Sequence, residues 1–132
     1  MIASAEPVVK RPPGPAVPET ALVAARAAAG KLGEDTVVLA MGELLGVTDA
    51  FVITSGRNTR QVRTIAEEVE RLVKEHSGRS PWAVEGGHEL RWVLLDYGDF
   101  LVHVFLEEDR RYYDLERLWG NAERVRWEAG GS

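Results

Sequence analysis

The sequence contains no cysteine, and this absence excludes several kinds of chemistry. Disulfide bridges, thiolate catalysis and cysteine-based zinc or iron–sulfur sites are not available to the chain. The absence also fits a cytosolic protein, because disulfides form and persist mainly in oxidising compartments and are rare in the cytosol. We therefore expect a cytoplasmic protein whose function depends on other side chains.

The chain also lacks long apolar runs and an excess of basic residues. No segment approaches the roughly 20 apolar residues of a membrane-spanning helix, and the N-terminal residues do not have the pattern of a secretory signal. Sixteen Lys and Arg against 21 Asp and Glu give a net charge of -5. Phosphate backbones are bound mainly by basic side chains, so we expect no direct DNA binding. The lack of a long apolar run predicts that the chain has no membrane partner. A basic protein partner fits this charge better.

At 132 residues the chain is long enough for one domain with a hydrophobic core. Residues 1–17 hold four of the six prolines and little hydrophobic mass, which predicts a disordered tail. Residues 18–120 are predicted to form the folded domain. Residues 121–132 are predicted to be a flexible C-terminal tail.

Hydrophobic periodicity predicts two long helices. The first covers about residues 19–32 and is rich in alanine, and the second covers about residues 59–76 with apolar residues three or four positions apart. Asn58 is a plausible N-cap of the second helix, with Gln61 three residues later. Strands are predicted at residues 36–41, 49–54, 80–85, 92–96 and 99–105. Residues 42–48 are predicted to be a turn with a little strand extension, 107–113 a polar bridge, and 114–119 a short capped helix.

This order of elements predicts an α/β protein with a single mixed five-stranded sheet and flanking helices. Two long amphipathic helices can cover one face of such a sheet. Part of the opposite face is then expected to remain free for a partner.

The segment from Trp92 to Phe105 carries more hydrophobic surface than one sheet face needs. A two-residue turn at Tyr97 and Gly98 is predicted, which pairs Asp96 with Asp99, Leu95 with Phe100, and Trp92 with His103. Alternation of side chains then predicts a core face made by Val93, Leu95, Phe100, Val102 and Val104. The second face is apolar in the middle and acidic at the turn, and contains Trp92, Leu94, Asp96, Asp99, Leu101, His103 and Phe105.

Trp92 is the sharpest candidate for partner binding on this second face, because tryptophan is over-represented among interface hot spots. A core tryptophan under a helix is an equally good interpretation. Asp96 and Asp99 suggest a paired-carboxylate magnesium site, as in nucleotidyltransferases. However, they are three residues apart across a turn, and no third carboxylate aligns with them. A turn motif or a partner-facing acidic pair is favoured, and neither a metal nor a cofactor is expected.

The segment from Ser55 to Asn58 lies between a strand and a helix N-terminus, where backbone amides can hold an anion. It lacks the lysine and the spacing of a P-loop, so a strand-to-helix turn with a cap is favoured. His76, His88 and His103 are scattered and form no recognisable triad. We therefore expect no catalytic residues, with a magnesium-dependent nucleotidyltransferase-like enzyme as the alternative.

Several motifs nevertheless occur in a specific order, at residues 49–56, 60–62, 84–86, 92–99, 102–105 and 113–119. Together they resemble the bacterial ribosomal silencing factor family, RsfS, which is related to the plant Iojap proteins. The resemblance covers about residues 20–119. It implies a mixed α/β, nucleotidyltransferase-like fold without the catalytic acidic motif of those enzymes.

The resemblance also implies a function. Members of this family bind the large ribosomal subunit through ribosomal protein fourteen at the intersubunit face, and so exclude the small subunit. Translation is thereby repressed when nutrients are scarce, a stress response of stationary phase. The residues expected at the contact are Glu85, Trp92, Leu94, Asp96, Tyr97, Asp99, Leu101 and His103. A homodimer through the same apolar face is a further possibility.

Overall fold

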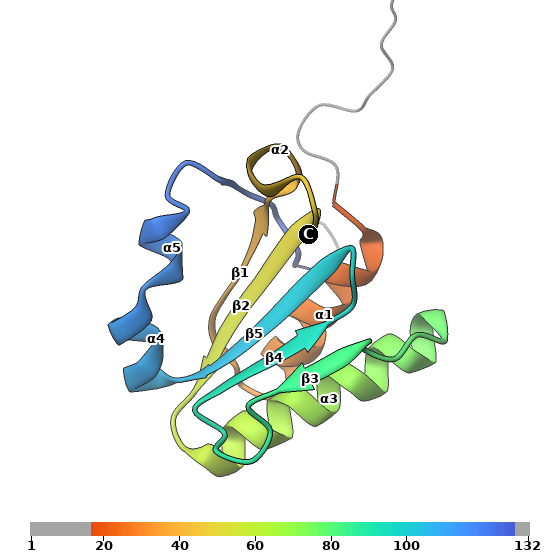
Figure 1. Ribbon diagram of the computed structural model, residues 1–132. Helices are drawn as coiled ribbons and strands as arrows, with labels where there is room; N and C mark the ends of the chain where they lie inside the picture. The colour runs from red at the N-terminus through yellow and green to blue at the C-terminus, as the bar shows by residue number, and fades with distance from the viewer. Residues whose placement is uncertain (1–16, 129–132) are drawn as a thin grey trace, which may run out of the picture.

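The structure, a computed structural model, describes residues 17–128, which form one mixed sheet with helices on both faces (Figure 1). The elements are α1 Glu19–Gly30, β1 Glu34–Ala40, α2 Gly42–Leu45, β2 Ala50–Gly56, α3 Thr59–Ser77, β3 Ala83–Glu85, β4 Trp92–Asp96, β5 Phe100–Leu106, α4 Glu107–Tyr113, α5 Leu115–Leu118 and β6 Glu123–Arg124. The strand order is β3-β4-β5-β2-β1-β6. Only β2 and β5 pair in parallel within the described sheet. Except for Val17, the predicted N-terminal tail lies outside the described residues.

Helices α1 and α3 cover one face of the sheet, as the sequence predicts (Figure 1). The buried side of α1 consists of alanines, whose small side chains let the helix lie close to α3 and the strands. The buried stripe of α3 consists of Val62, Ile65, Ala66, Val69 and Val73. No helix among residues 17–128 has the length and apolar character needed to cross a membrane.

The predicted start of α3 is confirmed. Asn58 has an extended backbone, and its Oδ1 accepts a hydrogen bond from the Gln61 amide at 2.9 Å. The helix ends at Gly78, whose left-handed backbone (φ 75°) lets its amide donate to the Lys74 carbonyl at 2.8 Å. Both ends of α3 are therefore determined locally.

The sheet has six strands, so the prediction of five strands is wrong. The additional strand, β6, pairs with Leu39 and Ala40 of β1. Beyond it, Trp127 Nε1 donates to the Thr36 carbonyl at 2.9 Å. The described residues up to 128 therefore form part of the domain rather than the predicted flexible tail. A two-residue polar strand has no periodicity that a sequence could display.

Two further elements differ from the sequence prediction. Residues 42–45 form the helix α2 instead of a turn with strand extension, and residues 107–113 form α4 instead of a polar bridge. Both helices are too short to show a reliable 3.6-residue pattern. In α4, Arg111 and Glu107 lie one helical turn apart with an N–O distance of 3.5 Å.

The register of the β4–β5 hairpin also differs from the predicted one. Asp96 pairs with Leu101, not with Asp99, and the loop consists of Gly98 and Asp99. Gly98 has a positive φ of 89°, which glycine adopts at little cost, whereas Tyr97 remains in extended pairing with Phe100. The observed register shifts each cross-strand partner by two residues. Because side chains alternate between the two faces, this shift leaves the predicted core face unchanged. The residues of that face are buried.

Gly86 follows β3 and is predicted to be intolerant of substitution. It has a positive φ of 81°, and a Cβ there would collide with the Trp92 carbonyl oxygen. We expect Gly86→Ala to lower the free energy of unfolding by about 2 kcal/mol, from backbone strain and overpacking. Urea unfolding measures this. The matched control is Gly87→Ala, whose Cβ would have its nearest neighbour, Val84 Cγ1, at 4.0 Å. Equal losses for the two variants would contradict the prediction.

Candidate functional site

Three adjacent strands bring most of the predicted contact residues onto one surface. In the register of β3, β4 and β5, Glu85 lies opposite Leu94, and Asp96 lies opposite Leu101. Cross-strand partners share a face, and alternation adds Trp92 to the same side. We call the surface formed by Glu85, Trp92, Leu94, Asp96 and Leu101 the open face. Glu85 is exposed and the other four residues are partly exposed.

The remainder of the same sheet face is covered. Its buried cluster consists of Leu39, Met41, Phe51, Ile53 and Phe105, and Leu115, Trp119 and Ala122 pack against it. Figure 1 shows α4 and α5 at the β1–β2 side of the sheet, whereas β3 and β4 lie toward the opposite edge. The two short helices therefore cover this face only in part, and the open face is the portion that they leave accessible.

Trp92 lies at the border between these two regions. Its ring centroid is 4.7 Å from that of Phe105 below it and 4.7 Å from that of Tyr113 on α4. Its indole Nε1 donates to His103 Nδ1 at 3.1 Å. Trp92 thus combines the two interpretations of the sequence, because it packs on the core and remains partly exposed.

Tyr113 is a residue that the sequence reasoning did not select for the site. It is 48% exposed while its ring packs on Trp92. A tyrosine at this position is well suited to a contact surface, since its ring is large and its hydroxyl tolerates water. The available signal was its place at the start of the 113–119 motif.

Two of the predicted contact residues are buried. Tyr97 is 1% exposed, on the α3 side of the sheet, with its ring stacked on Phe100. Burial raises the pKa of Tyr97 to about 12. His103 shares the face of Trp92 but is only 5% exposed. Neither side chain is directly available to a partner in this conformation.

The acidic pair does not form a joint site. Asp96 Oδ1 accepts a hydrogen bond from the Gly98 amide at 2.8 Å, and Asp99 forms an ion pair with Arg79 at 2.6 Å. Each carboxylate thus has its own partner in or beside the turn. Within residues 17–128, no cluster of three or more His, Asp or Glu side chains is suitably placed for a metal ion.

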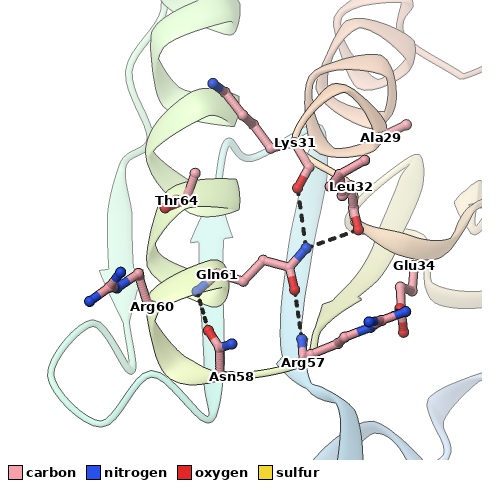
Figure 2. A pocket seen from close by; sticks show the side chains of 10 residues that line it. Ala29, Lys31, Leu32, Glu34, Arg57, Asn58, Arg60, Gln61 and Thr64 are labelled. Atoms are coloured by element: carbon pink, nitrogen blue, oxygen red, sulfur yellow. Dashed lines mark hydrogen bonds and ion pairs between the residues drawn. The ribbon is translucent and has the colours of Figure 1, made fainter.

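A cleft of about 710 Å³ lies where the end of α1 meets the start of α3 (Figure 2). Several of its polar groups are paired with one another. The Arg57 amide donates to Gln61 Oε1 at 2.8 Å, and Gln61 Nε2 donates to the carbonyls of Lys31 and Leu32. Together with the Asn58 cap, these bonds occupy amides that an anion would need. The segment is the predicted strand-to-helix turn with a cap.

Residues 15–131 match the protein family described as "Ribosomal silencing factor during starvation". The chain belongs to this family. The ribosomal silencing factor RsfS of Bacillus subtilis is 43% identical over 100 residues, which cover 76% of this chain and 84% of the relative. RsfS of Halalkalibacterium halodurans is 40% identical over 106 residues, covering 80% of this chain and 90% of the relative. The resemblance found in the ordered motifs is therefore confirmed.

A solved structure has the same fold. The crystal structure of a protein from Chromobacterium violaceum superposes with a TM-score of 0.74 at 32% sequence identity. The match covers 85% of this chain and 92% of that one. This likeness supports the mixed α/β fold with one sheet and flanking helices described above.

Proposed function

We propose that this protein silences translation by binding the large ribosomal subunit through ribosomal protein fourteen and blocking association with the small subunit. Membership in the ribosomal silencing factor family supports a role at the ribosome. The observation that carries the proposed contact is the open face, a sheet surface centred on Trp92 that α4 and α5 leave uncovered. Silencing then acts under nutrient limitation, in stationary phase, in the cytoplasm.

The chemistry of the open face suits a basic protein partner. Trp92, Leu94 and Leu101 supply apolar area, and Glu85 and Asp96 supply negative charge beside it. A specific interface buries about 1,200–2,000 Å², with an aromatic centre and a polar rim. The net charge of -5 favours encounter with basic protein over bare rRNA phosphate.

This mechanism requires no catalysis. A protein bound at the intersubunit face prevents subunit joining by mutually exclusive occupancy, so neither a cofactor nor a reacting group is needed. In this proposal a nucleotidyltransferase-like fold serves as a docking body and not as an enzyme. A homodimer through the open face would hide the ribosome-binding surface, and light scattering at several concentrations tests for it.

The test of the contact is Trp92→Ala. We expect the variant to bind separated large subunits at least tenfold more weakly in a co-sedimentation assay, since a central tryptophan is a typical hot spot. We also expect it to stop lowering the yield of joined ribosomes when the two subunits are mixed. Thermal unfolding must confirm that the variant is folded.

The matched control is Trp82→Ala. Trp82 precedes the edge strand β3, is 81% exposed, and lies outside the open face with its ring over Gly98. We expect this variant to bind within about twofold of the unmodified protein, as surface substitutions outside a contact usually do. Full binding by folded Trp92→Ala would remove the open face from the contact. Loss of binding in Trp82→Ala alone would move the contact to the β3 edge.

A further inference from the structure

His103 on β5 lies beneath the open face in an unusual environment for a polar side chain. It is 5% exposed, and its ring centroid lies 4.6 Å from that of Phe51 and 6.2 Å from that of Phe105. The third aromatic neighbour is Trp92, at 6.0 Å. The surrounding rings are those of the buried cluster under α5, not of a solvated site.

Among residues 17–128, only one nitrogen of this imidazole has a hydrogen-bond partner. Nδ1 accepts the hydrogen bond from Trp92 Nε1 at 3.1 Å. Since Nδ1 is the acceptor, the proton of the neutral ring is on Nε2, and Nε2 has no hydrogen-bond partner among the described residues. Burial lowers the pKa of His103 to about 4, so the ring is neutral at pH 7 and Nδ1 is free to accept.

Stability alone does not account for a histidine at this position. An unpaired buried N–H is unfavourable, whereas a phenylalanine would occupy a similar volume among the same rings without it. What histidine supplies and phenylalanine lacks is the acceptor for the Trp92 indole. What His103 adds to the structure is therefore the hydrogen bond that it accepts from the Trp92 indole.

We propose that His103 is a positioning residue, which fixes the orientation of the Trp92 indole for docking on the ribosomal partner. The inference rests on the proposed function. The hydrogen bond holds one edge of the indole, and the ring of Tyr113 packs against it at 4.7 Å. A side chain ordered before binding loses less freedom in the complex. The bond also pairs the indole N–H, which an apolar contact would otherwise leave unpaired after water is removed.

The first test is His103→Phe, with stability and binding measured on the same protein. We expect the melting temperature to stay equal or rise, and co-sedimentation with large subunits to weaken about tenfold. The Trp92 indole N–H resonance, assigned by its absence in Trp92→Phe, is expected to move toward the position of an unbonded indole. A purely structural role would not separate binding from stability in this way.

A pair of carboxamide variants provides the second test. In His103→Asn the side-chain oxygen lies close to where Nδ1 lies, whereas in His103→Gln it lies closer to Nε2. We expect Asn to retain the indole hydrogen bond and to bind more tightly than Gln, although both are less stable than the unmodified protein. This comparison also decides the question if His103→Phe does not fold.

The outcomes separate the two proposals. Failure of the unmodified protein to bind large subunits would overturn the proposed function, and this inference with it. Normal binding by the unmodified protein and equally tight binding by folded His103→Phe, with a shifted indole resonance, would overturn the positioning role alone. Equal binding by the Asn and Gln variants would also overturn it.

Discussion

Replacing Arg110 by alanine is expected to lower the free energy of unfolding by about 3–5 kcal/mol, the usual cost of breaking a buried ion pair from one side. The Arg110 side chain is 10% exposed, and its Nη2 lies 2.6 Å from the Glu116 carboxylate, which is 21% exposed. Nε also donates to Glu116, at 3.2 Å. The pair joins α4 to α5, so its loss leaves a largely buried carboxylate without its cation.

Arg110 also connects these helices to the sheet. Nη1 donates to the Glu34 carbonyl at 2.8 Å and to Ser55 Oγ at 3.1 Å, and Nη2 donates to the Asp35 carbonyl at 2.6 Å. A lysine could not replace this set of planar donors, so Arg110→Lys should also be destabilising. Because α4 carries Tyr113, the same change is expected to loosen the packing on Trp92.

The neighbouring residue provides the control. Arg111 is 70% exposed and lies 3.5 Å from Glu107, a surface pair one helical turn away. Exposed pairs of this kind contribute about 0.3–0.5 kcal/mol, so Arg111→Ala should leave the urea midpoint nearly unchanged. A similarly small decrease in the free energy of unfolding for both variants would show that the Arg110 contacts do not stabilise the fold as expected.

The contrast between these two arginines shows a limit of sequence analysis. In the sequence they are adjacent members of one charged segment, and the predicted polar bridge over residues 107–113 treats them alike. The buried role of Arg110 depends on contacts 75 and 76 residues away in the chain, to Asp35 and Glu34. Local patterns cannot report such contacts, because only the folded sheet brings the partners together.

The hairpin shows what local patterns do predict. The alternation of Val93, Leu95 and Val102 against Trp92 and Leu101 places these five residues on the faces that they occupy in the structure, whereas Asp99, predicted on the second face, lies in the loop. The predicted register was wrong by two residues, which preserves the faces but changes every partner. Trp92 therefore lies opposite Phe105, yet its indole still reaches His103, because diagonal neighbours are within range of long aromatic side chains.

For the candidate site, too, the sequence predicted which strand residues share a face but not all of their contacts. Residues at alternating positions on β4 and β5 share the open face, as expected from the period of a strand. Tyr97 could not be placed in advance, since its side depends on which residue of the hairpin loop takes the positive φ. The cover over Trp92 was also not predictable, because α4 shows no periodicity and its position depends on Arg110.

His103 leads to a pH dependence of stability. Burial among aromatic rings lowers its pKa from 6.5 to about 4 in the folded protein. Between these two values the unfolded chain binds a proton that the folded protein does not bind. The contribution of the neutral His103 side chain to the free energy of unfolding is fully present above pH 6.5 and is lost as the pH falls toward 4. Over this range the loss amounts to about 3 kcal/mol, at 1.36 kcal/mol per pH unit.

The measurement is urea unfolding of the unmodified protein and of His103→Phe from pH 7 to pH 4. Phenylalanine does not titrate, and every other ionisable group is common to both proteins. The difference between their free energies of unfolding should therefore change by about 3 kcal/mol in favour of His103→Phe as the pH falls. Parallel curves would mean that His103 is protonated as readily in the folded protein as in the unfolded chain, which contradicts its burial under the open face. A difference that develops between pH 6.5 and 4 would show that the imidazole stays neutral where Trp92 needs its acceptor.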